Sequence, residues 1–253
     1  MKYFETIKDY INLEIGCKRF RYNMEKFHYN PISLDIYSVE LFPNIQTLYL
    51  YHPFDNQFPW KKNIHRRICL KEIYYTTYKK MPNRERIEYK EIIFGEKDFK
   101  EYKKENELKQ IQTLPEEITI IDTNCIYGNN NIEKLIIPNK VKRIEKFGIT
   151  SNYILTEIII PTYVTYLGEG CFMNNSCLRN VTIPTSITQI PKRSLTFCDF
   201  LEEIQFPTTL KRIDKIIIPC WIRSITIPES LTHINHFLFI NMFMLKTLQI
   251  SGE

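Results

Sequence analysis

The stretch "EIIIPTYVTYLGEGCFMNNSCLRNVTIP" (157–184) begins and ends on nearly the same phrase, an apolar-rich run followed by a proline. Its two prolines belong to a longer, evenly spaced series. Pro115, Pro138, Pro161, Pro184 and Pro207 keep a constant spacing, Pro228 follows slightly early, and Ser251 occupies the next position of the series. A fixed period over six units indicates a protein built from stacked repeats.

Six columns of six residues, counted from the positions of this series, are entirely apolar. Three columns lie six, three and one residues before the positions from Pro138 to Ser251, and three lie three, six and eleven residues after the prolines from Pro115 to Pro228. Apolar residues at minus three and minus one have the period of two that places alternate side chains on one face of a short β-strand. The proline that follows cannot donate to a strand ladder, so it ends each strand. One unit cannot bury these residues alone, whereas stacked units can.

A polar column lies nine residues before four of the prolines. It contains Asn129, Asn152, Asn175 and Cys198. Short polar side chains at one buried corner of each turn can bond the backbone of the neighbouring turn. We therefore expect this column to have a structural role.

The unit around Pro161 resembles the BspA-type (Treponema pallidum-type) leucine-rich repeat. The resemblance is carried by Leu155, Ile158, Pro161, Phe172 and Leu178 together with their spacing, and it extends over about residues 108–253. It implies a right-handed repeat solenoid, rich in β-structure, with parallel strands on a concave face. It also implies non-catalytic protein recognition, because members of the family are recognition proteins and some bacterial ones are adhesins.

The non-core positions of the strands, four and two residues before the proline, are expected to form the concave surface. These twelve residues are Lys134, Ile136, Glu157, Ile159, Asn180, Thr182, Glu203, Gln205, Ser224, Thr226, Thr247 and Gln249. Two isoleucines among hydroxyl and amide side chains give a mixed, nearly neutral face, which suits a protein or peptide ligand. The last strand, 245–250, has no polar unit after it, and this predicts self-association through the C-terminal edge.

Residues 1–40 are expected to form a small helical cap, because apolar residues within 4–27 fit helical faces. The segment "DYINLEIGCKRFR" (9–21) also resembles the second half of an F-box. That resemblance implies a substrate adaptor of a ubiquitin ligase as the alternative function. A Skp-type adaptor would then be bound by Ile11, Leu13, Ile15, Cys17 and Phe20.

Residues 41–107 are expected to contain a degenerate first repeat and a basic insertion, ahead of the solenoid at 108–253. The stretch 41–53 resembles one more strand unit, with Ile45, Leu48 and Leu50 inward. Between 61 and 90 there are ten Lys and Arg against three Glu, and aromatic residues are interleaved with them. Within residues 54–107, only IEYKEIIF (87–94) is a strand candidate. A nucleic-acid surface or a nuclear-localisation patch is the alternative to a solvated insertion.

No residue pattern indicates catalysis or a cofactor. His233 and His236 flank Ile234, a core position, and lack the third ligand that a zinc site needs; "GEG" (168–170) is expected to be a turn. Residues 111–253 hold 13 basic and 13 acidic residues, which disfavours nucleic-acid binding there. Seven cysteines without a CxxC pair, and no long apolar run, predict a cytoplasmic protein, with the nucleus or a surface location reached without a signal peptide as alternatives.

Overall fold

A computed structural model describes residues 5–20, 22–35, 37–52, 64–106, 109–216, 221–234, 236–240 and 242–251. The chain divides into two compact units. The first contains residues 1–73 and 77–92, and the second contains residues 74–76 and 93–253. Each unit has its own packing and is described separately.

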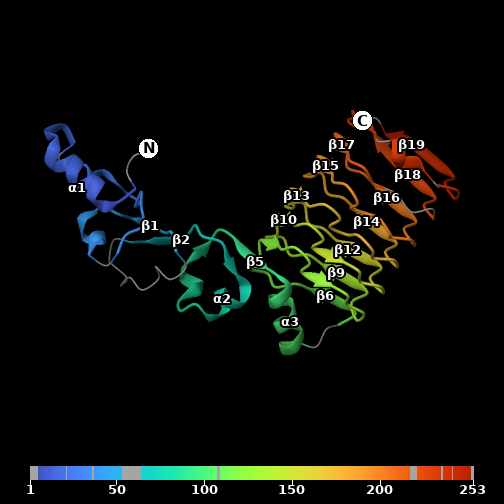
Figure 1. Cartoon of the computed structure of the whole chain (residues 1–253), viewed down its shortest axis with the longest axis horizontal. Coiled ribbons are helices and arrows are strands. Elements are labelled where there is room, and N and C mark those ends of the chain that lie inside the picture. The colour runs from blue at the N-terminus through green and yellow to red at the C-terminus, as the bar shows by residue number, and fades with distance from the viewer. Residues whose placement is uncertain are drawn as a thin grey trace. The chain divides into compact units, whose positions relative to one another are not determined.

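The second unit is a stack of repeat turns in which one strand of each turn joins a seven-stranded parallel sheet, from green to red in Figure 1. The order of strands is β19-β18-β16-β14-β12-β9-β6, so each strand pairs with those of the adjacent turns. The strands are β6 (Ile111–Thr113), β9 (Lys134–Ile136), β12 (Glu157–Ile159), β14 (Asn180–Thr182), β16 (Glu203–Gln205), β18 (Ser224–Pro228) and β19 (Thr247–Ser251). The predicted strand before each proline is confirmed.

The turns that follow Pro115, Pro138, Pro161, Pro184 and Pro207 then add a second short strand five and six residues after the proline. These strands are β7 (Ile120–Ile121), β10 (Arg143–Ile144), β13 (Tyr166–Leu167), β15 (Gln189–Ile190) and β17 (Arg212–Ile213). The first three pair in the order β13-β10-β7, and β7 pairs with β5 (Ile92–Phe94), whereas β15 and β17 form a separate two-stranded sheet. A third pair, β8 (Ile126–Tyr127) and β11 (Ile149–Thr150), is also parallel.

The predicted apolar columns form the core of the stack. Leu135, Ile158, Val181, Ile204 and Ile225 are all buried at the position three before the proline, and the residues one before the proline are buried in the same turns. The last turn differs: Ile234, Phe239, Leu248 and Ile250, expected in the core, are exposed. The sheet order explains the two residues of β19, because no described strand packs beyond it.

The polar column makes the structural bonds that its position predicts. Asn152 and Asn175 are buried, and the Asn175 Nδ2 donates to the carbonyl oxygens of Ile149 and Phe172 at 2.9 and 2.8 Å. The Cys198 thiol donates to the same Phe172 oxygen at 3.2 Å. Cysteine therefore replaces asparagine in this column while keeping one of its hydrogen bonds.

The first unit has a core of its own around a three-stranded parallel sheet, β1-β2-β4. Ile45, Leu48 and Leu50 are buried in it, as the pattern of 41–53 predicts. Tyr10 of the first helix packs there against Phe27 and Phe42. The helices and strands described from residue 5 to residue 89 are α1 (Ile7–Gly16), η1 (Lys18–Phe20), η2 (Met24–Lys26), η3 (Ser38–Leu41), β1 (Thr47–Leu50), β2 (Arg66–Cys69), β3 (Ile73–Tyr74), α2 (Tyr75–Lys80), η5 (Arg84–Arg86) and β4 (Glu88–Tyr89).

Residues 64–106 have more regular structure than the sequence pattern predicts. The single strand expected over 87–94 is two short strands, β4 and β5, which join different sheets. Strand β2 lies within the basic segment, where Arg67 and Cys69 are buried. Helix α3 (Glu96–Glu105) was not predicted; its start is stabilised by Asp98, which accepts the Gly95 backbone N–H at 2.8 Å.

Candidate protein-binding surface

The twelve predicted surface residues all lie on the seven-stranded sheet, on strands β9 to β19. Each is exposed or half-buried. Every strand carries two of them, and in strands β9 to β18 the residue between these two is buried. This alternation follows from the strand geometry, which points successive side chains to opposite faces. We refer to the twelve residues together as the sheet face.

The register of the strands arranges the sheet face in two rows that cross the turns. One row runs through Lys134, Glu157, Asn180, Glu203, Ser224 and Thr247, which pair in succession. The other row contains Ile136 beside Ile159, and Thr182, Gln205, Thr226 and Gln249 in succession. Neighbouring strands are about 4.8 Å apart, so both rows are continuous at the scale of a peptide ligand.

Charges on the sheet face are paired locally. The Lys134 Nζ lies 2.8 Å from the Glu157 carboxylate on the adjacent strand. The Gln205 side-chain amide donates to Glu203 at 3.0 Å. Beside the face, Arg179 and Glu202 form another cross-turn ion pair at 3.2 Å. The face thus contains one lysine and two glutamates, and one of the glutamates is offset by the lysine.

Strand β6 extends this face by two residues that the sequence analysis missed. Ile111 and Thr113 are exposed, and they align with Lys134 and Ile136 of β9. The signal for them was Pro115, which belongs to the repeat series and should be preceded by a strand like the others. Ile111, with 60% of its surface exposed, adds a large apolar side chain at this end of the face.

The F-box-like residues occupy α1 and its continuation. Ile11 packs against the core of the first unit, while Leu13 and Cys17 are half-buried. Ile15 is 80% exposed. The backbone of Phe20 belongs to η1, and its side chain lies outside the described residues. The five residues are therefore not gathered on one exposed surface, since Ile11 serves the core.

Several side chains of the basic segment within 61–90 form ion pairs and ring contacts inside the protein. Arg66 and Lys90 both pair with Glu88, and the Arg84 guanidinium lies 5.5 Å from the centre of the Tyr78 ring. Tyr78 also contacts Tyr89 edge to face. Trp60, Lys61 and Lys62 lie outside the described residues. Tyr78 and Tyr89, two of the aromatic residues of this segment, thus have protein partners.

The buried cysteines have a packing role. Burial raises the pKa of the Cys171 and Cys198 thiols to about 12, so both are neutral at physiological pH. Within the described ranges, no three His, Cys, Asp or Glu side chains are grouped so that they could hold a metal ion. The helices that the structure describes include none long and apolar enough to cross a membrane.

Comparison with known proteins agrees with the repeat architecture. The family model described as the BspA type leucine rich repeat region matches residues 94–219 and 218–253, in six copies. A search among curated proteins found no significant match. Among solved structures, a leucine-rich repeat protein from T. pallidum is 18% identical with a TM-score of 0.52, covering 56% of this chain and 69% of that one.

A second solved structure, a leucine-rich repeat protein from Bacteroides ovatus, is 15% identical with a TM-score of 0.45. It covers 83% of this chain and 55% of that one. The T. pallidum structure supports the fold alone, whereas the family model spans more than half of the chain. This chain therefore belongs to the family of BspA-type leucine-rich repeat proteins.

Proposed function

We propose that the protein is a non-catalytic recognition scaffold whose sheet face binds a protein or a peptide. The observation that carries the proposal is the pair of continuous rows of exposed side chains held over a buried core. A rigid stack of strands fixes the positions of these side chains, and this lowers the entropic cost of binding. Membership of a leucine-rich repeat family supports the same function.

The composition of the sheet face favours a polypeptide ligand. The exposed Ile159 and its neighbour Ile136 supply apolar contact, and threonine and glutamine side chains supply hydrogen bonds. Protein interfaces combine such an apolar centre with a polar rim. Polyanions would find little attraction there, because the one lysine of the face pairs with Glu157 and Glu203 adds a negative charge.

Affinity purification with two matched variants tests this proposal. The face variant carries Ile159→Lys, Thr182→Lys and Gln205→Lys, and the control carries Thr162→Lys, Thr185→Lys and Thr208→Lys in the turns of the same repeats. All six side chains are exposed, and both variants gain the same charge. Partners identified by mass spectrometry should disappear with the face variant and remain with the control. Retention by both would refute binding at this face.

A second candidate function is a Skp-dependent adaptor, and the exposure of Ile15 favours it. An isoleucine that is 80% exposed at the end of a helix is available to a partner. Ile15→Asp should then remove a Skp-type protein from the purified complex, whereas Lys8→Asp, on an exposed position of the same helix, should not. Absence of such a protein from the wild-type complex would exclude the adaptor function.

A further inference from the structure

Positive charge gathers along one side of the repeat stack, away from the sheet face. The segments from four to nine residues after each proline hold eight Lys and Arg but only four Asp and Glu, which leaves five and nine elsewhere in 111–253. These segments contain the second strands of the turns. A repeat region with equal numbers of positive and negative residues is therefore strongly asymmetric in charge.

A hollow of about 860 Å³ lies on this side, between β17 and the segment 232–234. A second hollow, of about 400 Å³, lies between β13 and β15 and shares Lys192 and Asp214 with the first. Both coincide with interruptions of the second sheet: β13 and β15 belong to different sheets, and β17 pairs with the described part of the next turn through the isolated Arg212–His233 bridge. Because the two hollows share Lys192 and Asp214, we name them together the trough.

The trough carries its positive charges on the outside and its negative charges underneath. Glu169 lies within 3.2 to 3.6 Å of Lys146, Lys192 and Arg193, and its side chain is only 17% exposed. Asp214 is 19% exposed; it accepts a bond from Arg212 at 2.7 Å and one from Gln189 at 2.7 Å. The cationic side chains of these pairs are 52% to 63% exposed. A ligand would therefore meet positive charge first.

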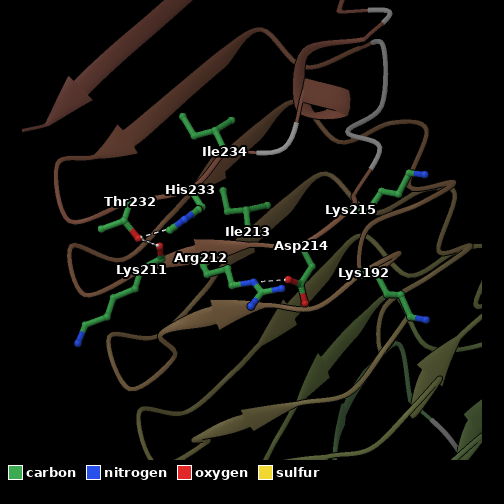
Figure 2. A pocket seen from close by; sticks show the side chains of 9 residues that line it. All are labelled: Lys192, Lys211, Arg212, Ile213, Asp214, Lys215, Thr232, His233 and Ile234. Atoms are coloured by element: carbon green, nitrogen blue, oxygen red, sulfur yellow. Dashed lines mark hydrogen bonds and ion pairs between the residues drawn. The ribbon is translucent and has the colours of Figure 1, made fainter.

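The cations of the larger hollow are spread along it. In Figure 2, Lys211 projects at one side, Lys192 and Lys215 project at the other, and the Arg212–Asp214 pair lies between them. Ile213 and Ile234 lie in the same view, with Ile234 exposed. A single small anion could not reach all three lysines, whereas an extended chain with several negative groups could. Ile213 is buried, so Ile234 is the residue of this pair that offers apolar contact to a ligand beside the cations.

We propose that the trough binds an acidic peptide segment of a partner protein, in which negative and apolar side chains alternate. A nucleic-acid strand fits less well, because one face of Tyr166, the tyrosine that lines the trough, is covered by the Arg143 guanidinium at 4.7 Å from its ring centre. Strand-binding sites use open aromatic faces on which bases stack. This site is separate from the sheet face and does not depend on it.

Fluorescence anisotropy of the full chain tests the proposal with a labelled peptide that alternates glutamate and leucine. The trough variant carries Lys192→Glu, Lys211→Glu and Lys215→Glu, and the control carries Lys140→Glu, Arg223→Glu and Lys246→Glu, which are exposed outside the trough. Circular dichroism checks that both fold. The trough variant should bind roughly tenfold more weakly or worse, and the control should stay close to the wild type. The affinity should also fall as salt rises.

Three results would overturn the proposal. The first is no binding of the peptide by the wild type at low salt. The second is an equal loss in both variants, which would indicate a general charge effect instead of a site. The third is tighter binding of an oligothymidylate than of the peptide, with the same lysines required, which would assign the trough to nucleic acid.

Discussion

The side-chain oxygen of Asn175 accepts a hydrogen bond from the backbone N–H of Asn152, one repeat earlier in the chain, at 2.9 Å. Asn152 in turn accepts the N–H of Asn129, again one repeat earlier, at 3.0 Å. Each asparagine thus connects its own turn with the one before it. The bonds are buried, so a lost partner would leave a polar group without water. This ladder fixes the register of the turns that carry the sheet face.

Replacing Asn175 should destabilise the repeat unit markedly. The change Asn175→Ala removes two donated bonds and leaves the Asn152 N–H without its acceptor. We expect a loss of about 2 kcal/mol or more in the free energy of unfolding, measured by urea denaturation followed by circular dichroism. Asn139→Ala, at an exposed turn position, should change it by less than about 0.5 kcal/mol. Similar values for the two variants would contradict a structural role for the ladder.

The cysteines should react according to their burial. Cys171 and Cys198 are buried with pKa values raised to about 12, whereas Cys17 and Cys177 are half-exposed. Iodoacetamide at mildly alkaline pH should modify the latter two in the native protein and the former two only after unfolding, because the thiolate is the nucleophile. Peptide mass spectrometry assigns each site. Rapid native modification of Cys198 would show that the turn opens there.

Alkaline pH should weaken the fold through the same thiols. Burial raises the pKa of Cys171 to about 12, above the value of about 8.5 for an unfolded cysteine, so the unfolded chain loses its proton first. The stabilisation is complete below about pH 8.5 and is lost as the pH rises toward 12. The urea concentration at the midpoint of unfolding should fall as the pH rises, and it should fall less steeply in Cys171→Ala than in the wild type. If the midpoint fell equally steeply with pH in both proteins, the Cys171 thiol would not be the cause of the alkaline destabilisation.

Gly168 should tolerate no side chain, because it touches the turn before it. A methyl group at Gly168 would lie 2.6 Å from the backbone carbon of Glu145, which a side-chain rotation cannot relieve. Gly168→Ala should therefore lower the free energy of unfolding by about 3 kcal/mol or more. Gly128→Ala meets no atom within 4 Å and strains only its backbone at φ +62°, for about 1 kcal/mol. Equal losses of unfolding free energy in the two variants would contradict close packing of Gly168 against the turn before it.

The repeat spacing predicts most of the second unit, because a constant period fixes both the strand and the face of each side chain. The Asn129 to Cys198 column was predictable for the same reason, since a short polar residue recurred at one buried corner. Strand β6 was also predictable, because Pro115 belongs to the same series as the prolines that follow the other strands of the sheet. Leu248 and Ile250 keep the apolar pattern of the core, and their exposure follows from the uncovered edge expected at the strand 245–250, not from that pattern.

The first unit was harder to predict, because strands β2 and β4 lack the proline that marks the strands of the repeats. Arg66–Cys69 contains two arginines in a charged context, yet it is a strand between β1 and β4 with Arg67 buried. The trough was also hidden from the sequence. Lys192 and Lys215 lie one full repeat apart along the chain, and only the stacking of turns brings such residues to one side, where the balanced total charge conceals the local excess.

Site-specific photocrosslinking tests the central claim most directly. A photoreactive amino acid is placed at Thr182, on strand β14 of the sheet face, or at Thr185, three residues later in the turn; both threonines are exposed. Irradiation in native lysate should join the partner to position 182 and not to position 185. Crosslinking at 185 alone, or equally at both positions, would contradict recognition through the sheet face.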